Sequence, residues 1–245
     1  MNMLIIGGAS GLGRALVDLA LRLGHEVCVL DHDQTGLMAL PAAVATSVCD
    51  ISDPDSIDEA LDSVADRSQF DLVAITAGIS AIGRFEEIDP IAMYRVTAIN
   101  LTGTMMMTHA LVKRGQLARG GRLVLTSSLS HFVGYPGASA YAATKDGVIA
   151  FGRSIRRELR RNHDVTVQIV APGPMDTPHA ARYAPPGSRA DRRAKPETVA
   201  AAILSRRRGG LFVPDLASRS AAIAGRLMPA LVGRIMRKAI YMRLP

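Results

Sequence analysis

Tyr141 and Lys145 are the residues whose types and spacing first indicate acid–base chemistry in this sequence. They lie four residues apart in a predicted helix, so their side chains share one face about one turn apart. A phenol with a reference pKa of about 10 must lose roughly three units to act near neutrality, which requires about 4 kcal/mol of preferential stabilisation of the phenolate. One positive charge at about 4 Å supplies roughly that amount at an effective dielectric constant of about 20, so Lys145 alone would nearly suffice. The same spacing arises by chance on many helices, so other residues must support it.

Two polar residues in other segments strengthen the prediction. Ser128 follows a predicted strand at 121–127 and precedes Tyr141 by thirteen residues, and ligands of open α/β sheets bind at the carboxyl ends of strands. Its hydroxyl could hold a substrate oxygen near Tyr141, whereas Ser127 points to the opposite side and is predicted to be structural. Asn100 lies in a predicted helix that otherwise holds Met, Thr and Leu, where its simplest role is a backbone hydrogen bond at a kink.

A glycine-rich turn near the start of the chain indicates a phosphate site. It follows the first predicted strand and reads Gly7-Gly8-Ala9-Ser10-Gly11-Leu12-Gly13. Glycines let a backbone approach a pyrophosphate, and the N–H groups and positive dipole end of the next helix favour phosphate. Glycines also mark ordinary loops, so it is the position between a strand and a helix that predicts a dinucleotide here.

Acidic residues follow the next two predicted strands. Asp31 stands 18 residues after Gly13, where a carboxylate accepts hydrogen bonds from the adenosine ribose hydroxyls. This carboxylate would repel a 2′-phosphate, so the sequence predicts NAD rather than NADP; the alternative is that Asp31 only solvates a loop. Asp50 could accept from the adenine amino group while Ile51 packs on the ring, or Asp50 could cap the next helix.

The segments between these motifs must form the elements that position them. Apolar runs of strand length alternate with segments of helical period, which predicts an α/β fold: a Rossmann-type, doubly wound, mainly parallel seven-stranded sheet with helices on both faces. The predicted strands lie at 3–6, 26–30, 44–49, 71–75, 121–127, 164–170 and 211–213. The predicted helices lie at 11–23, 54–66, 88–114, 139–162 and 196–206. Residues 172–196 show no period and are predicted to form a loop, with a substrate lid at 178–195.

Composition favours one cytoplasmic domain. The chain has 245 residues of which 48% are apolar, enough for a full core, and residues 1–213 are predicted to form a single cofactor-binding and catalytic domain. Cys28 and Cys49 lie in apolar runs without a CxxC pair, which favours a reducing compartment over a redox or metal site. The N-terminus lacks the basic lead-in of a signal peptide. The longest stretch without charged residues, 96–112, contains four threonines, so no transmembrane helix is predicted.

The net charge of +7 belongs to the end of the chain. From Arg206 onward there are nine Lys or Arg residues and one acid, whereas residues 1–205 hold 20 basic and 21 acidic side chains. Residues 214–245 are predicted to be a basic amphipathic extension. It either lies on an anionic membrane surface or folds over the substrate pocket or a neighbouring subunit. The second alternative is favoured, because Pro229 interrupts the helix; a nucleic-acid partner is not predicted, because aromatic interleaving is absent.

Taken together, these motifs resemble those of the short-chain dehydrogenase/reductase family, over residues 1 to about 213. The correspondence in chain order is the glycine motif at Ile6 to Gly13, the NAD-selecting acid at Asp31, the adenine-contacting acid at Asp50, the NNAG motif at Ile75-Thr76-Ala77-Gly78, the helix asparagine at Asn100, the serine at Ser128, the YxxxK pair at Tyr141 and Lys145, and the PGxxxT motif at Pro172 to Thr177. In two places the chain departs from the family pattern. Ile6 replaces a Thr, and Ile75-Thr76 replaces two Asn that tie the central strand to its neighbours, which puts local rigidity in question.

The resemblance implies a role for each of these residues. Tyr141 would exchange the hydroxyl proton, Ser128 would orient the substrate, and Lys145 would lower the pKa of Tyr141 and bind the nicotinamide ribose. Asn100 would anchor a water of a proton relay, and Thr177 would contact the carboxamide. The predicted cofactor contacts are Gly7, Ser10, Gly11, Leu12, Gly13, Asp31, Asp50, Ile51, Ala77, Gly78, Tyr141, Lys145, Pro172, Gly173 and Thr177.

The predicted function is hydride transfer between NAD and a secondary alcohol or ketone. The segment 131–136 between Ser128 and Tyr141 is mostly apolar, which favours a partly apolar substrate; His131 within it is expected at the surface. One alternative is an NAD-binding sensor or scaffold without turnover, and another is a membrane-surface reductase of a lipophilic substrate. Small residues in the predicted helix 139–162 favour close helix pairing, so a homodimer or homotetramer is predicted.

Overall fold

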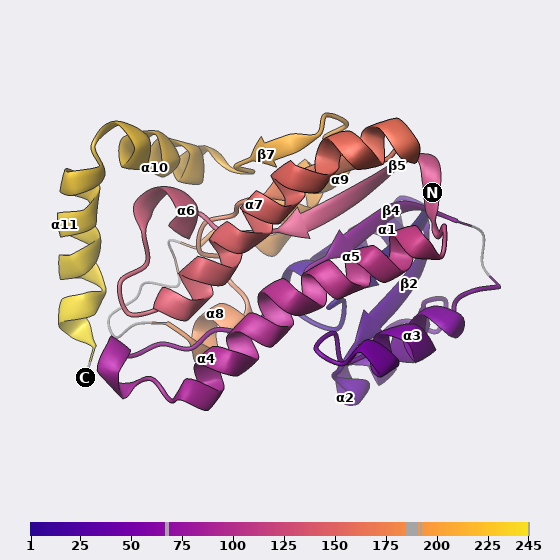
Figure 1. Cartoon of the computed structure of the whole chain (residues 1–245), viewed down its shortest axis with the longest axis horizontal. Helices are drawn as coiled ribbons and strands as arrows, with labels where there is room; N and C mark the ends of the chain where they lie inside the picture. Colours follow the sequence, from indigo (N-terminus) through magenta and orange to yellow (C-terminus); the bar gives the residue numbers. More distant parts are fainter. Residues whose placement is uncertain (67–68, 185–190, 192, 245) are drawn as a thin grey trace.

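The computed structural model describes residues 1–66, 69–184, 191 and 193–244, and a single sheet forms its centre (Figure 1). The strands are β1 (Asn2–Ile6), β2 (Glu26–Asp31), β3 (Ala45–Val48), β4 (Phe70–Ile75), β5 (Leu117–Thr126), β6 (Thr166–Val170) and β7 (Gly210–Phe212). Within the described residues they form a seven-stranded sheet in the order β3-β2-β1-β4-β5-β6-β7, and neighbouring strands are parallel throughout. The predicted Rossmann-type sheet is confirmed.

The strand order reverses between β1 and β4. The chain adds β2 and β3 on one side of β1, then returns to β4 on the other side and continues outward from there. β1 and β4 pair in register up to Ile6 and Ile75, so the loops that follow them leave the sheet side by side. Doubly wound sheets bind their ligands at such a reversal, which places the glycine-rich turn at the expected ligand edge.

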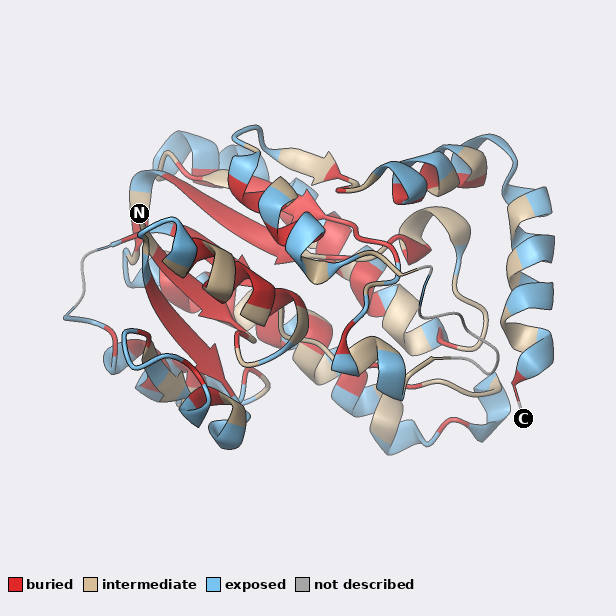
Figure 2. Cartoon of the chain, turned by 180° about the vertical axis from the view of Figure 1, so that it is seen from behind, coloured by how far each residue is buried: buried red, intermediate tan, exposed pale blue. Residues whose placement is uncertain are grey.

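Helices cover both faces of the sheet, as predicted. They are α1 (Gly11–Arg22), α2 (Gln34–Met38), α3 (Pro54–Asp62), α4 (Pro90–Thr97), α5 (Thr104–Lys113), α6 (Ser130–Val133), α7 (Ser139–Asn162), α8 (Pro178–Arg182), α9 (Pro196–Ser205), α10 (Leu216–Leu227) and α11 (Pro229–Ala239). In β1, Leu4 packs with the core of α3, α5 and α7, and Ile5 packs with the opposite core of α1 and α9. Both faces are buried (Figure 2), which explains why the strands are almost wholly apolar.

The prediction of one helix at 88–114 is wrong. A π-helical segment, Ala98–Gly103, separates α4 from α5, and a π turn holds one more residue than an α turn. Gly103 lies so close to the Ile51 carbonyl oxygen that a Cβ there would collide with it. The interruption therefore fits the helix against the loop after β3, and it leaves Asn100 fully buried.

Three short helices are also absent from the sequence prediction. α2, α6 and α8 have only four or five residues, too few to show a helical period. The predicted loop at 172–196 is wrong in part, because α8 follows Thr177 and interrupts it. Residues 185–190 and 192 of the predicted lid lie outside the described residues.

Arg122 joins β5 to the end of α9. Its side chain is buried, and its Nη1 donates to the carbonyl oxygens of Ile203 (3.1 Å) and Arg206 (2.7 Å). Gln168 on β6 donates to the same Arg206 oxygen at 2.7 Å. Burial lowers the pKa of Arg122, but a cation at a helix C-terminus is favourable because the last carbonyls have no helical donors. Arg122 thus holds α9 against the sheet.

Replacing Arg122 by Met should destabilise the fold by about 2 kcal/mol, because buried carbonyl oxygens at the end of α9 lose their donor. Urea denaturation followed by circular dichroism measures this. The matched control is Arg119→Met, which removes an exposed arginine from the same strand and should change stability by less than about 0.5 kcal/mol. Equal stabilities of the two variants would contradict the role given to Arg122.

Candidate active site

The turn after β1 is pressed against the loop after β4. Gly7 has a φ of +83°, and a Cβ on it would lie 2.5 Å from the Ala77 nitrogen. A Cβ on Gly13, in the first turn of α1, would collide with the Gly7 carbonyl oxygen. Only glycine fits these two positions. The packing brings the predicted cofactor contacts Gly7, Gly13 and Ala77 together.

Thr76 ties the end of β4 to this turn. Its Oγ1 shares its proton between the carbonyl oxygens of Ile6 (2.9 Å) and Gly7 (3.0 Å), and its backbone nitrogen donates to Ile6 O at 2.8 Å. The sequence put rigidity here in question because Ile75-Thr76 replaces two Asn. The threonine hydroxyl supplies a tie of its own, so the end of the central strand remains fastened to its neighbour.

The N-terminus of α1 opens onto the same turn. Ser10 is its N-cap and makes no side-chain cap hydrogen bond, and the first turn carries no acidic residue. The N–H groups of that turn are therefore available to an anion, which the positive end of the helix dipole also favours. Gly11 has a φ of +56°, and Leu12 is buried beneath it. The turn and the helix end fit the pyrophosphate of a dinucleotide.

Asp31 lies on the other side of the glycine-rich turn. It is 7% exposed, and its Oδ2 accepts from the Ala9 nitrogen at 2.9 Å, while its Oδ1 accepts from the Asp33 nitrogen at 3.0 Å. The alternative that Asp31 only solvates a loop is wrong, because this buried carboxylate holds the turn in place. It stands at the carboxyl end of β2, where the sequence places the adenosine ribose.

Asp50 and Ile51 follow β3. The Asp50 Oδ1 accepts from the Ser52 nitrogen (2.9 Å) and hydroxyl (2.6 Å), and the hydroxyl bond is the main cause that lowers the pKa of Asp50. The alternative that Asp50 caps the next helix is wrong, because Asp53 is the N-cap of α3. Ile51 is 5% exposed and belongs to the core, so its side chain offers little surface to an adenine ring.

Tyr141 and Lys145 lie in the first two turns of α7, beside the end of β5. The Lys145 Nζ is 5.7 Å from the centroid of the Tyr141 ring and donates to the Thr126 carbonyl at 3.0 Å. The Ser127 hydroxyl donates to the Lys145 carbonyl at 2.7 Å, so its structural role is as predicted. The structure therefore brings Tyr141 and Lys145 together, and the backbone of β5 fixes the position of Lys145.

Ser128 stands between the strand and the pair. Its Oγ accepts from the Ser130 nitrogen at 3.2 Å, and its side chain acts to lower the pKa of the Tyr141 phenol. The backbone donor occupies a lone pair of the serine oxygen, so the hydroxyl proton is directed elsewhere. The predicted serine and tyrosine are therefore neighbours at the end of β5.

Asn100 connects three elements. Its Oδ1 accepts from the Ile79 nitrogen at 2.8 Å, and its Nδ2 donates to the Ile79 carbonyl at 2.9 Å and to the Thr144 hydroxyl at 3.1 Å. Thr144 in turn donates to the Tyr141 carbonyl at 2.8 Å. A Cβ on Gly78 would lie within 3.3 Å of both Asn100 and Lys145. Asn100 thus fixes the loop after β4 against α7, which is the backbone role that its sequence position predicted.

Burial dominates the electrostatics of the pair. It raises the pKa of Tyr141 to about 12, against which the hydrogen bond of Ser128 acts in part. It lowers the pKa of Lys145 to about 8. The expectation that Lys145 alone nearly provides the required pKa shift is therefore wrong for the chain by itself, because desolvation of the phenolate outweighs one cation at this distance.

The segment after β6 closes over the glycine-rich turn. Thr177 is the N-cap of α8 and accepts from the Ala180 nitrogen at 3.1 Å, and its methyl group would lie 3.5 Å from a Cβ on Gly11. The Pro172 carbonyl accepts from the Leu129 nitrogen at 2.8 Å. Gly173 packs directly beneath α10. Of the predicted PGxxxT contacts, Thr177 thus lies beside the glycine-rich turn, whereas Pro172 and Gly173 contact Leu129 and α10.

Sequence reasoning placed Tyr135 in the segment expected near the substrate but missed two other aromatic rings near Tyr141, those of His179 and Tyr183. The ring centroid of Tyr135 lies 6.0 Å and that of His179 lies 6.4 Å from the Tyr141 ring, and Tyr183 lies 4.8 Å from His179. Burial lowers the pKa of His179 to about 4, so its imidazole is neutral near pH 7. The signal that could have found it is Thr177-Pro178, a cap followed by a first-turn proline, which predicts a helix start.

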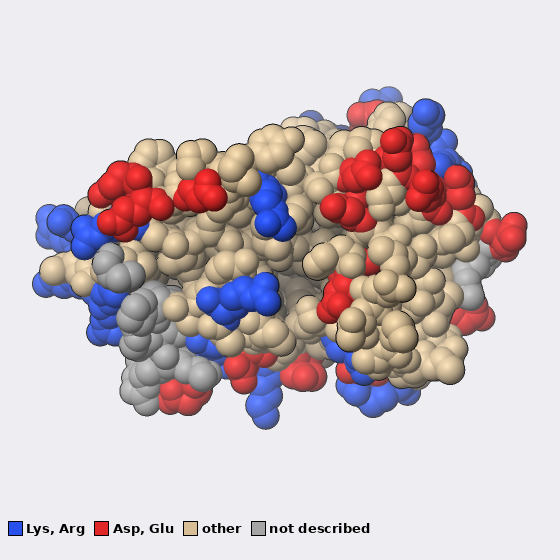
Figure 3. All heavy atoms as spheres, turned by 90° about the horizontal axis from the view of Figure 1, so that it is seen from below, with Lys and Arg blue, Asp and Glu red and all other residues tan. Residues whose placement is uncertain are grey.

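His131 takes no part in this cluster. Its Nδ1 lies 3.0 Å from the Asp146 carboxylate, and its side chain is 25% exposed, so the residue expected at the surface is largely covered. Viewed from below, the molecule is hollowed near the middle of its face; acidic side chains gather over the end with α2 and α3, and Lys and Arg at the end with α11 (Figure 3).

Comparison with known proteins supports the geometry. The family model described as short chain dehydrogenase matches residues 1–186. The 3-oxoacyl-[acyl-carrier-protein] reductase MabA of Mycobacterium tuberculosis is 32% identical over 177 residues, which cover 72% of this chain and 70% of the relative. The sorbitol dehydrogenase of Cereibacter sphaeroides is 32% identical over 183 residues, which cover 72% and 71%.

Solved structures agree in fold. A short chain dehydrogenase from Burkholderia cenocepacia in complex with NADP superposes with a TM-score of 0.81 at 21% identity, covering 96% of each chain. A 3-ketoacyl-(acyl-carrier-protein) reductase from Brucella melitensis complexed with NADH superposes with a TM-score of 0.77 at 22% identity, covering 86% of this chain and 95% of the other. The fold is therefore shared with proteins whose structures hold NADH and with others whose structures hold NADP.

Replacing Thr76 by Val should loosen the glycine-rich turn, because the carbonyl oxygens of Ile6 and Gly7 lose their shared hydroxyl donor. We expect a stability loss of about 1 to 2 kcal/mol and a rise of about fivefold to tenfold in the Kd of NADH, measured by fluorescence titration. The control Thr97→Val removes a hydroxyl that bonds only within α4 and should leave the Kd unchanged. An unaltered Kd in the Thr76 variant would refute the tie.

Proposed function

Because this chain belongs to the short-chain dehydrogenase family, we propose that it transfers a hydride between NAD and a secondary alcohol or ketone, with Tyr141 as the acid/base. The family makes it an NAD(P)-dependent oxidoreductase of CH–OH and C=O groups. The observation that carries the finer proposal is the grouping of Tyr141, Ser128 and Lys145 at the carboxyl end of β5. A sensor or scaffold without turnover would have no need of all three.

The three side chains divide the work. Tyr141 is neutral near pH 7, since burial holds its pKa high, so it can give a proton to a carbonyl oxygen in reduction. Ser128, already oriented by the Ser130 nitrogen, donates to the same substrate oxygen. Lys145 provides the positive charge that stabilises the phenolate left behind. NAD, when bound, accepts or gives the hydride and in its oxidised form adds a further positive charge.

Cofactor binding is assigned to the residues at the strand reversal. The turn from Gly7 to Gly13 and the N-terminus of α1 would hold the pyrophosphate. Asp31 would accept from the ribose hydroxyls. NAD is proposed over NADP, because a 2′-phosphate would face this buried carboxylate. The segment from Pro172 to Thr177 would cover the nicotinamide end.

The surroundings of Tyr141 favour a partly apolar, uncharged substrate. The rings of Tyr135 and His179 lie 6.0 and 6.4 Å from the Tyr141 ring, and the Tyr183 ring lies 4.8 Å from that of His179. The neutral imidazole of His179 can donate or accept one hydrogen bond but offers no charge to pair with a carboxylate. A homodimer or homotetramer and a cytoplasmic location stay predictions.

Replacing Tyr141 by Phe should lower kcat about a thousandfold, because the acid/base is lost, while the Kd of NADH stays within about twofold. A set of secondary alcohols and ketones followed through NADH absorbance provides the assay. In the unaltered enzyme, alcohol oxidation should rise with pH over the range in which the Tyr141 phenol ionises and ketone reduction should fall over the same range, because oxidation needs the ionised phenol and reduction the protonated one. Tyr135→Phe removes a neighbouring phenol and should keep most turnover. Retained turnover in the Tyr141 variant would refute its role.

Replacing Asp31 by Asn should shift the cofactor preference. Asn keeps an oxygen for the Ala9 nitrogen but removes the charge, so kcat/KM with NADP should rise about tenfold and that with NAD should fall by a similar factor. The control Asp50→Asn removes a carboxylate at the next strand and should affect NAD and NADP equally. A preference for NADP in the unaltered enzyme would overturn the role of Asp31.

A further inference from the structure

The last two helices form a feature at one end of the molecule. α10 runs along one edge and α11 turns away from it after Met228, so that together they make an L (Figure 1). α10 buries only Ser218, Ala222 and Gly225, and Gly225 packs on the Phe132 carbonyl of α6. α11 has no buried residue and is mostly coloured as exposed (Figure 2). Only one side of this L-shaped pair of helices packs against the rest of the molecule.

The outward side of α10 is apolar. Leu216, Ile223 and Leu227 lie seven and four residues apart, which places them on one side of the helix, opposite the small buried residues. Leu227 is 75% exposed and Ile223 is 58% exposed. A surface helix of a globular protein normally presents polar residues there. This face is therefore built for an apolar contact that the single chain does not supply.

The apolar surface continues onto α11. Leu231 and Ile235, one turn apart, are each about half exposed, as is Met228 at the corner of the L. Val232 and Met236 on the inner side are only partly covered. Contiguous apolar exposure of this kind marks a binding surface rather than ordinary scatter.

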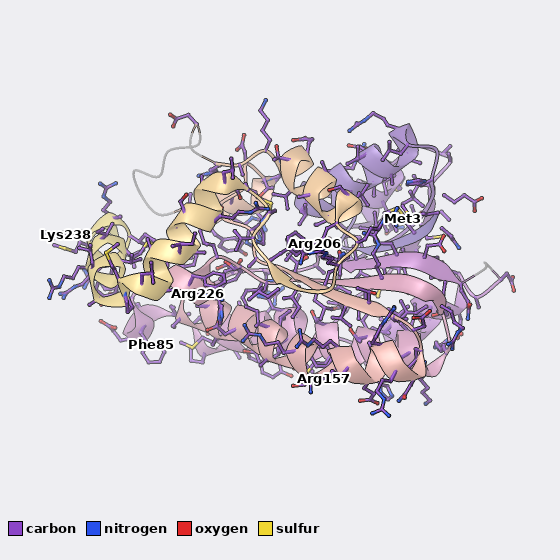
Figure 4. The ribbon with its side chains drawn as sticks, turned by 90° about the horizontal axis from the view of Figure 1, so that it is seen from above. Met3, Phe85, Arg157, Arg206, Arg226 and Lys238 are labelled. Carbon is purple, nitrogen blue, oxygen red and sulfur yellow. The ribbon has the colours of Figure 1, made fainter. Side chains whose placement is uncertain are left out.

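Cations surround this apolar surface. The sequence from Leu216 to the end of the chain contains no Asp or Glu, and its six Lys and Arg residues are all exposed: Arg219, Arg226, Arg234, Arg237, Lys238 and Arg243. The Arg226 guanidinium covers the Phe132 ring at 4.9 Å, and Lys238 extends away from the body (Figure 4). Exposed leucines and isoleucines flanked by cations match a surface that is both apolar and negatively charged.

We propose that α10 and α11 dock on an anionic lipid bilayer, with their apolar side chains in the interface and their cations at the headgroups. Within the described residues no helix has the length and hydropathy to span a membrane, and helices of 12 and 11 residues are suited to lie in the interfacial plane. A second copy of this chain fits less well, because a symmetric contact would bring the two sets of cations together. Nucleic acid would supply the charge but no apolar partner.

Co-sedimentation of the full chain with vesicles tests the proposal. Vesicles of phosphatidylcholine mixed with phosphatidylglycerol should bind the protein at least about tenfold more strongly than vesicles of phosphatidylcholine alone, and high salt should reduce the binding. Absence of binding to the anionic vesicles, or equal binding to both kinds, would overturn it.

Paired variants locate the surface. Leu227→Ser with Ile235→Ser should weaken binding about tenfold, whereas Leu23→Ser with Met38→Ser, which removes exposed apolar residues elsewhere, should not. The triple change of Arg234, Arg237 and Lys238 to Gln should weaken binding by a similar factor. The control triple change of Arg153, Arg157 and Arg161 to Gln removes the same charge from exposed positions on α7.

Each variant is first shown to retain its circular dichroism spectrum and its Kd for NADH, so that loss of fold is distinguished from loss of docking. Equal weakening by the α7 variant would show general attraction of a basic protein and would refute the assigned surface. Light scattering that detects a dimer, lost in the Leu227 and Ile235 variant while vesicle binding is absent, would assign the surface to a second copy instead.

Discussion

The close approach of two backbone loops at the strand reversal is the constraint on which the rest of the site depends. Gly7 and Ala77 come this close because Gly7 has no side chain, since a Cβ on it would collide with the Ala77 backbone. Thr76 then fastens that contact through a single hydroxyl. One residue further, Gly78 leaves room for Asn100 and Lys145. A continuous line of contacts therefore runs from the cofactor turn to the catalytic helix.

This continuous line of contacts explains why polar side chains lie inside the core. Asn100 makes three hydrogen bonds to fix Ile79 and Thr144, and Lys145 is held to the backbone of β5. Removing charged groups from water has a cost at this site. Desolvation lowers the pKa of Lys145 to about 8 and raises that of the neighbouring Tyr141 to about 12. The cost makes the phenolate sensitive to any added positive charge, since charges interact strongly where water is excluded. A buried lysine beside a partly buried phenol can therefore respond to a bound cationic ring in a way that an exposed pair cannot.

The extent to which sequence predicts this site follows from the range of the interactions involved. The residues at strand ends and the four-residue spacing of Tyr141 and Lys145 are local, so the sequence placed them correctly. Contacts between segments that are far apart in the sequence could not be predicted from it. The π-helical segment depends on Gly103 meeting Ile51, and the ring of His179 reaches Tyr141 from a helix too short to show a period. The sequence predicted a lowered pKa for Tyr141, because the four-residue spacing shows that Lys145 is near. The spacing does not show that the phenol is desolvated.

The C-terminal extension illustrates the same limit and adds a spatial consequence. Its sequence supports both a membrane surface and a cover over the substrate pocket, and the fold makes these compatible. The inner side of α10 packs on α6, and Leu244 packs on Gly137; both contacts lie in the segment between Ser128 and Tyr141. The outer side of α10 remains apolar and faces away from them. A helix that uses small residues inward and large ones outward is thus attached to the substrate side of the enzyme while leaving its larger apolar area for another surface. A docked enzyme would then hold the segment between Ser128 and Tyr141 close to the phase in which apolar alcohols and ketones dissolve.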